Sequence, residues 1–218
     1  MRLVPNAITL IGLPAGLLTG FFLYKGLFFF ASVSLLVLCA CDFFDGALAK
    51  KRGLTSPFGA FLDSTVDRTT EFFIFMGALF YYFEEGSIGM AVVTYWALAG
   101  SLLVSYTRAR AENFIKNCRV GFWERPERLL LMLSGLLTGR LKTVLWILAI
   151  GATSTFLDRI LHTRESLRHN ERDLFERAAG AAHPFYQRVL FWRYPRASWP
   201  YRIYVGLVVL LTLCVRLP

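Results

Sequence analysis

The chain has 218 residues and a formal net charge of +9, and 56% of its residues are hydrophobic, with a mean hydropathy of +0.49. This composition excludes an ordinary soluble domain and indicates a multi-spanning membrane protein. In such a protein, a surplus of basic residues marks cytoplasmic loops and anionic lipid rather than nucleic acid as the partner. The four cysteines form no CxxC pair, so we expect reduced thiols without zinc or disulfides.

Six apolar runs follow one another along the chain, and we interpret each as a transmembrane helix. The first and the fourth are uncharged over 22 residues, which is long enough to cross the hydrocarbon core of a bilayer. The last two are shorter and need their polar flanks to complete a span. The runs cover residues 3–24, 26–49, 59–83, 86–107, 129–139 and 143–157. The expected fold is therefore an all-α integral membrane protein with six transmembrane helices.

The basic residues predict the orientation of these helices. With the N-terminus in the cytoplasm, 19 of the 24 lysines and arginines fall inside. Four fall outside, namely Lys25, Arg140, Lys142 and Arg216, and Arg68 lies at membrane depth. We therefore expect a multi-pass protein of the cytoplasmic membrane.

The sequence divides into a membrane domain, residues 1–167, and a C-terminal extension, residues 168–218. The extension is rich in arginine and aromatic residues, which suits a lipid interface. Its last apolar run, 203–215, is compatible with a short seventh span, an interfacial helix or a partner contact. In the first run, Gly12, Gly16 and Gly20 allow close helix approach, either within the protomer or across a homodimer.

Four aspartates at membrane depth are the strongest functional signal. Asp42 and Asp45 share one face of the second helix, and Asp63 and Asp67 share one face of the third. A carboxylate at the bilayer centre costs about 2.5–3.5 kcal/mol, so four of them predict a function. Because the two helices are joined by a short loop, the pairs should face each other near the cytoplasmic surface. Oxygen ligands in such a cluster favour Mg²⁺, Mn²⁺ or Ca²⁺.

Residues around the aspartates favour a diphosphate as the ligand. Gly46 leaves the backbone next to Asp45 accessible to a bulky group. Lys50 and Ser56 supply a cation and a hydroxyl group, which together with a metal suit a diphosphate. The alternative interpretation of Lys50 and the two basic residues after it is an ordinary cytoplasmic charge run.

The spacing of these residues resembles the signature of the CDP-alcohol phosphotransferases. The matching stretch reads Asp42-x-x-Asp45-Gly46-x-x-Ala49-Lys50, then eight residues, then Gly59-x-x-x-Asp63-x-x-x-Asp67. Lys50 departs from the arginine of the family pattern, keeping the charge but losing the bidentate fork. The similarity covers roughly residues 5–167.

The resemblance implies transfer of a phosphatidyl or archaetidyl group from CDP-diacylglycerol or CDP-archaeol to an acceptor hydroxyl, with release of CMP. It implies a Mg²⁺ or Mn²⁺ site formed by Asp42, Asp45, Asp63 and Asp67, with Asp67 also the general base. Further residues are expected to bind the CDP-lipid: Asn6, Thr9, Asp45, Gly46, Ala49, Lys50, Ser56 and Gly59. For Asn6 and Thr9 the alternative interpretation is a helix N-terminus.

Arginines near the cytoplasmic ends of the later helices predict an anionic acceptor. Arg108, Arg128 and Arg159 lie in segments similar to those of the branch that uses inositol 1-phosphate, the phosphatidylinositol-phosphate and archaetidylinositol-phosphate synthases. There the matching positions form the pocket for the acceptor's phosphate. Glu112, Glu124 and Glu127 are expected to pair with these arginines or to hydrogen-bond an inositol ring. Glycerol 3-phosphate is the nearest alternative acceptor, and snorkelling to the interface is the alternative role for the arginines.

Two other classes of protein would also place carboxylates in a membrane. A cation transporter needs them along its pathway, but an arginine cluster on the same side would repel the cation. A lipid-binding scaffold has no use for a fourth carboxylate acting as a base. The sequence therefore favours the phosphotransferase.

Overall fold

The computed structural model describes residues 4–52, 57–115, 117–173 and 206, with side chains described for 12–42, 57–115, 117–168 and 206. This part of the chain forms six helices and no strands, which confirms the all-α expectation. They are α1 (Val4–Tyr24), α2 (Phe28–Arg52), α3 (Pro57–Glu84), α4 (Ile88–Ala111), α5 (Arg125–Thr138) and α6 (Leu141–Asp173). Two segments, Ile88–Ala111 and Leu141–Arg168, are long and apolar enough to cross a membrane. Crossing by all six helices stays a prediction, as does the C-terminal extension, which lies almost wholly outside the described residues.

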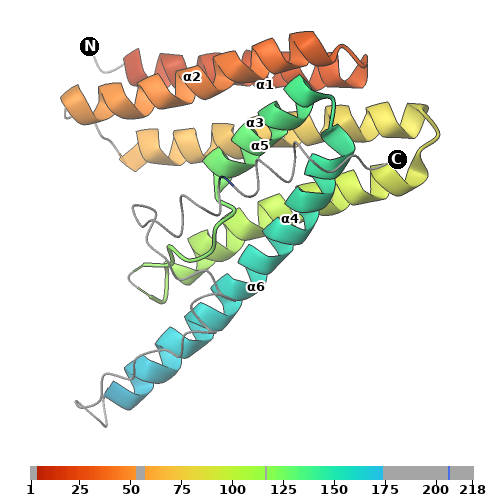
Figure 1. The fold of residues 1–218 in the computed structure, drawn as a ribbon. Coiled ribbons are helices and arrows are strands. Elements are labelled where there is room, and N and C mark those ends of the chain that lie inside the picture. The colour runs from red at the N-terminus through yellow and green to blue at the C-terminus, as the bar shows by residue number, and fades with distance from the viewer. Residues whose placement is uncertain (1–3, 53–56, 116, 174–205, 207–218) are drawn as a thin grey trace.

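The helices form two groups, which meet where α3 packs against α4, and α5 lies between them (Figure 1). In the first group α1 packs against both α2 and α3, and in the second α4 packs along α6. The short helix α5 contacts α2 on one side and α6 on the other. The far end of α6 extends beyond the other helices in Figure 1.

The last helix is longer than the sequence interpretation gave it. The apolar run was expected to end at residue 157, whereas α6 continues to Asp173. Residues 158–173 are mostly polar, but they include no glycine or proline, and leucine, arginine and glutamate favour helix. Hydropathy identified the apolar part of this helix and could not show where the helix itself ends.

Small residues bring α1 and α3 into close contact. A Cβ atom added to Gly77 would lie 2.0 Å from the backbone oxygen of Gly20, and one added to Gly20 would lie 2.3 Å from that of Phe73. A Cβ at Gly16 would lie 2.7 Å from the side chain of Thr70. The glycine stripe of the first helix thus serves packing within the protomer. This contact fixes α3, which carries Asp63 and Asp67.

Three tight turns join consecutive helices at one end of the bundle. Each contains a glycine with positive φ, namely Gly26, Gly86 and Gly139. In the first turn, Gly26 N–H donates to Leu23 O at 3.0 Å and Leu27 N–H donates to Phe22 O at 2.8 Å. This pair of bonds is the Schellman motif, and the other two turns repeat it. These glycines therefore form the turns at one end of the bundle, and the aspartates lie toward the opposite end.

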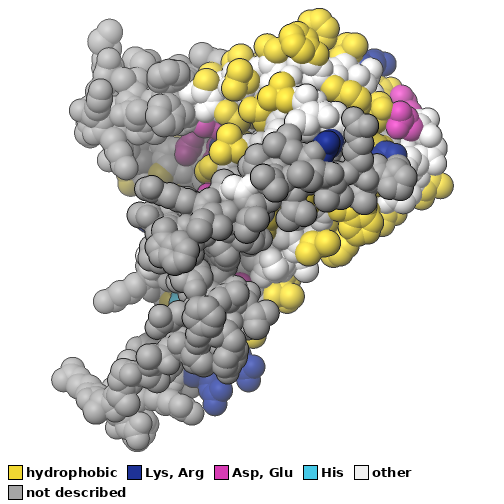
Figure 2. All heavy atoms as spheres, viewed as in Figure 1, with side chains coloured by type: hydrophobic (Ala, Val, Ile, Leu, Met, Phe, Trp, Pro, Cys, Tyr) yellow, Lys and Arg dark blue, Asp and Glu magenta, His cyan; other side chains and the backbone are white. Residues whose placement is uncertain are grey.

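The described surface carries many large apolar side chains. Hydrophobic atoms cover much of the described surface in Figure 2, over the helices of the upper part of the view. Phe29 is 72% exposed and Ile88 is 68% exposed. Exposed apolar area of this extent suits contact with lipid chains.

Candidate active site

Arg125 links two of the predicted aspartates. Its Nη1 atom donates a hydrogen bond to Asp42 Oδ2 at 2.7 Å and lies 2.8 Å from Asp67 Oδ1. Its Nη2 atom donates to Thr70 Oγ1 at 3.2 Å, and its buried Nε has no hydrogen-bond partner. Asp42 lies on α2, Asp67 on α3, and Arg125 is the first residue of α5. Three helices thus bring two carboxylates to one cation.

The other two aspartates lie one turn from these two along the same helices. Asp63 lies one turn before Asp67 on α3 and is exposed, while Asp45 lies one turn after Asp42 on α2. The side chain of Asp45 lies outside the described residues. Among the described side chains, no three acidic, cysteine or histidine groups come together as a metal site. The pair formed by Asp42 and Asp67 nonetheless fits a cation, because its carboxylate oxygens already share one.

A buried ion pair fixes α5 against α3. Arg128 donates from Nε to Glu71 Oε1 at 2.7 Å and from Nη2 to Glu71 Oε2 at 2.9 Å, and from Nη1 to Trp123 O at 2.7 Å. The two side chains are 2% and 1% exposed. Each nitrogen of Arg128, a predicted phosphate ligand, therefore already donates to a protein oxygen. Arg125 lies one turn earlier on the same helix, so this pair also positions it.

The other two predicted phosphate ligands converge on one carboxylate. Arg108 Nη1 lies 3.8 Å from Glu124 Oε2, and Arg159 Nη2 lies 3.6 Å from Glu124 Oε1. Arg108 also donates from Nε to Glu112 Oε1 at 3.0 Å. Arg159 is buried, and it donates to the carbonyl oxygens of Val120 and Val104. The structure thus places Arg108 and Arg159 on either side of an anion, and the expected pairing of Glu112 and Glu124 with arginines is confirmed.

The connection between α4 and α5 is held against α6. Gly121 has a φ of +89°, and Trp123 N–H donates to Thr155 Oγ1 at 3.2 Å. The Trp123 ring fills the space over Gly151, where a Cβ atom would lie 2.3 Å from its Nε1. Because Trp123 is buried, the backbone that carries Glu124 and Arg125 is anchored.

Several predicted donor-binding residues lie outside what the structure describes. Only the backbone is described for Asn6, Thr9, Asp45, Gly46, Ala49 and Lys50, and Ser56 falls in an undescribed segment. Gly59 lies in the first turn of α3 and is half-buried. The structure therefore reports the positions of these residues along the helices and not their contacts.

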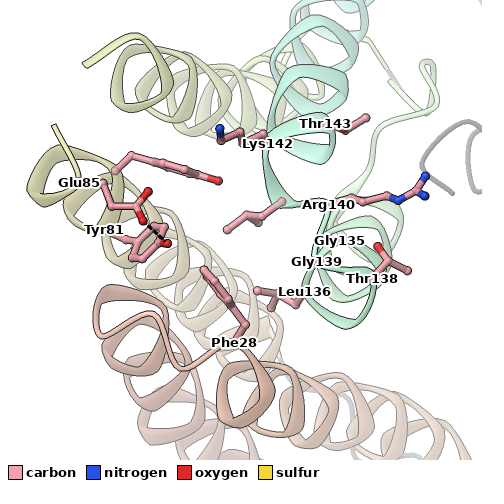
Figure 3. A pocket seen from close by; sticks show the side chains of 12 residues that line it. Phe28, Tyr81, Glu85, Gly135, Leu136, Thr138, Gly139, Arg140, Lys142 and Thr143 are labelled. Atoms are coloured by element: carbon pink, nitrogen blue, oxygen red, sulfur yellow. Dashed lines mark hydrogen bonds between the residues drawn. The ribbon is translucent and has the colours of Figure 1, made fainter. Parts of the chain in front are cut away.

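A separate cavity of about 580 Å³ lies at the other end of the bundle, at the glycine turns. Figure 3 shows Tyr81, Glu85 and Lys142 around it, with the Tyr81 hydroxyl group donating to Glu85 at 2.5 Å. Phe28 begins α2 and Leu136 lies near the end of α5, far along these helices from Asp42 and Arg125. The cavity is therefore not part of the aspartate site.

Comparison with known proteins decides the family. The sequence profile described as CDP-alcohol phosphatidyltransferase matches residues 2–166. The chain belongs to the CDP-alcohol phosphatidyltransferase family. It is accordingly an enzyme that transfers substituted phosphate groups, which confirms the resemblance seen in the signature and excludes the transporter and scaffold alternatives.

Characterised relatives are similar over most of their length. The phosphatidylinositol phosphate synthase of Mycobacteroides abscessus is 32% identical over 171 residues, 74% of this chain and 78% of the relative. The archaetidylinositol phosphate synthase of Pyrococcus horikoshii is 34% identical over 168 residues, 77% of this chain and 87% of the relative.

A solved enzyme also shares the fold. The phosphatidylinositol phosphate synthase of Mycobacterium tuberculosis with CDP-DAG bound matches with a TM-score of 0.67 and 31% identity, over 73% of this chain and 85% of that one. The same enzyme in complex with manganese and citrate matches equally well, over 81% of its chain. This structural neighbour thus binds manganese in one of its crystal structures.

Sequence reasoning missed Arg125 and Glu71 as members of the site. Arg125 is one of the 19 basic residues expected inside, and Glu71 lies in the third apolar run, but the sequence interpretation gave neither a role in the site. A signal was available for both. Glu71 continues the i, i+4 stripe of Asp63 and Asp67, and Arg125 precedes Arg128 by three residues, so each shares a helix face with a predicted site residue.

Proposed function

We propose that this enzyme transfers the phosphatidyl or archaetidyl group of a CDP-linked lipid to a hydroxyl of inositol 1-phosphate and releases CMP. The observation that carries the proposal is that two adjacent residues, Glu124 and Arg125, each belong to a different charged site. Arg125 contacts the aspartates, and Glu124 lies between Arg108 and Arg159. A cation site for a diphosphate and an arginine site for a phosphate monoester are what this reaction requires. The named relatives and the CDP-DAG complex support it.

In this reaction, the acceptor oxygen forms a bond to the lipid-side phosphorus while the bond from that phosphorus to the CMP oxygen breaks. Asp67 takes the proton of the acceptor hydroxyl, and a base of this kind contributes about 10²–10⁴-fold to the rate. Asp42, Asp45, Asp63 and Asp67 would hold Mg²⁺ or Mn²⁺. When bound, the metal neutralises the diphosphate and stabilises the leaving CMP. The metal set and the base are proposals, as is a donor site formed by Asn6, Thr9, Asp45, Gly46, Ala49, Lys50, Ser56 and Gly59.

The phosphate of the acceptor is proposed to bind Arg108, Arg128 and Arg159. The contacts of Arg108 and Arg159 with Glu124 support this role, because an anion in the position of the Glu124 carboxylate would contact both. All three nitrogens of Arg128 donate hydrogen bonds to Glu71 and Trp123, so Arg128 would bind phosphate directly only by giving up one of these bonds. With these bonds in place, Arg128 supports the pocket by holding α5 against α3.

The proposed setting is the cytoplasmic membrane, with all six helices crossing the bilayer and the site facing the cytoplasm. The excess of basic residues on the expected inner side supports this orientation. A homodimer is proposed as well, but the glycine stripe is used within the protomer and gives it no support.

CMP release from purified protein tests the function. CDP-diacylglycerol or CDP-archaeol is supplied as donor with Mg²⁺ or Mn²⁺, and either inositol 1-phosphate or glycerol 3-phosphate as acceptor. We expect release with inositol 1-phosphate and its loss in the Asp67→Asn variant. Release with glycerol 3-phosphate alone would keep the reaction and overturn the acceptor. No release with either donor and a wider acceptor set would contradict the proposed reaction.

A further inference from the structure

We propose that Arg125 is an internal counter-cation that holds the aspartate pair together in the metal-free enzyme, leaves it when metal binds and then contributes to binding the substrate phosphate. Metal and phosphate binding are thereby coupled through one side chain. The inference rests on the proposed metal site at Asp42 and Asp67. It concerns a residue to which neither the signature nor the acceptor pocket assigns a role.

Arg125 contacts oxygens that a metal ligated by Asp42 and Asp67 would also need. One nitrogen atom of Arg125 lies within 2.8 Å of carboxylate oxygens from both α2 and α3. The Arg125 side chain is only 16% exposed, so little water reaches this contact. The guanidinium therefore provides most of the neutralisation of the two carboxylates. A dication ligated by the same oxygens would repel the guanidinium at close range in a medium of low dielectric. The guanidinium and the metal would therefore not bind the same two oxygens together.

Anchors on both sides of Arg125 limit how it can move. Trp123 is held by its hydrogen bond to Thr155, and Arg128 by its buried pair with Glu71. The backbone between these anchors is short, so the side chain and not the helix has to change position. The buried Nε atom of Arg125 has no hydrogen-bond partner. After displacement of the guanidinium, this N–H is therefore still available to donate a hydrogen bond.

The displaced guanidinium would add a positive charge beside the proposed acceptor pocket. Glu124, the preceding residue, lies 3.8 Å from Arg108 and 3.6 Å from Arg159. An acceptor phosphate carries roughly two negative charges, which suits this concentration of arginines. The same displacement frees Asp67, the proposed base, from its ion pair. Coupling of this kind is reciprocal, so phosphate should also tighten metal binding.

The experiment measures Mn²⁺ binding to the full-length protein after removal of metal, using the electron paramagnetic resonance signal of free Mn²⁺. Arg125→Gln removes the competing charge, so we expect its Mn²⁺ dissociation constant to fall about tenfold. Arg119→Gln is the matched control, because Arg119 is an exposed arginine of the same connection. It should bind Mn²⁺ like the wild type. Asp42→Asn and Asp67→Asn should lose binding.

A second measurement follows inositol 1-phosphate binding by calorimetry with and without Mn²⁺. Mn²⁺ should tighten this binding in the wild type, and Arg125→Gln should reduce the enhancement by about tenfold. Attraction by the metal alone would leave the enhancement in Arg125→Gln unchanged, which would overturn the coupling. Without Mn²⁺, Arg125→Gln should unfold at a lower temperature than Arg119→Gln, and Mn²⁺ should raise its Tm by more.

Two results separate the failure of this inference from the failure of the proposed function. If Arg125→Gln binds Mn²⁺ no better than the wild type while the aspartate variants lose binding, Arg125 is not a competitor and the metal site stands. If the aspartate variants bind like the wild type, the proposed metal site fails and the inference with it. Should Arg125→Gln not fold, Arg125→Lys decides, because it keeps the charge without the fork. We expect it to bind Mn²⁺ more tightly than the wild type, and an unchanged dissociation constant would overturn the inference.

Discussion

The buried pair of Glu71 and Arg128 offers the sharpest test of how the site is held. We consider Glu71→Gln, which keeps the size of the side chain and removes its charge. Arg128 is 2% exposed, so its guanidinium would stay in the interior without a counter-charge. Breaking a buried pair by removing one partner costs about 3–5 kcal/mol. For a chain of this size, the loss corresponds to a fall in Tm of about 6–20 °C.

Thermal unfolding in detergent measures this effect, and the chain supplies an exposed pair for comparison. Glu112 pairs with Arg108 at 3.0 Å, but the two side chains are 39% and 30% exposed. Glu112→Gln should therefore cost only about 0.3–0.5 kcal/mol. Replacing both partners of the buried pair, by Glu71→Leu with Arg128→Met, should recover much of the lost stability. If Glu71→Gln costs no more than Glu112→Gln, the pair does not hold α5 in place.

Three further predictions concern other parts of the molecule. Gly77→Ala should lower stability by about 1–3 kcal/mol, because its Cβ would lie 2.0 Å from a backbone oxygen. Gly12→Ala, whose Cβ meets its nearest neighbour at 3.5 Å, should be tolerated, and a Tm as low as that of Gly77→Ala would contradict the packing argument. Burial raises the pKa of the Cys118 thiol, so at pH 8 its thiolate fraction falls below that of an ordinary cysteine. Maleimide labelling followed by mass spectrometry should therefore modify Cys118 slowly in the native protein and rapidly after denaturation; equal rates would refute the burial. Arg159→Gln should raise the KM for the phosphorylated acceptor more than that for the CDP-lipid, and equal changes in steady-state kinetics would indicate a structural role instead.

Local patterns predicted the helices well and the connections between them only in part. Apolar runs located all six helices, because such a run depends only on neighbours in the chain. The contact between Arg125 and Asp42 joins residues 83 positions apart, and that between Arg128 and Glu71 joins residues 57 apart. Such pairings depend on how helices pack, which hydropathy does not report. The spacing rules therefore identified the aspartates and missed the cation between two of them.

The angles at the three glycine turns also affect the positions of the distant aspartates. Along α3, the chain rises about 28 Å between Asp67 and the turn at Gly86. If the angle at that turn changed by about 3°, a helix of this length would carry the Asp67 carboxylate sideways by about 1.5 Å, most of a metal–oxygen bond length. A small change of angle at the turn would thus be amplified along the helix. Glycines at the far end of the bundle would thus contribute to the geometry of the proposed site.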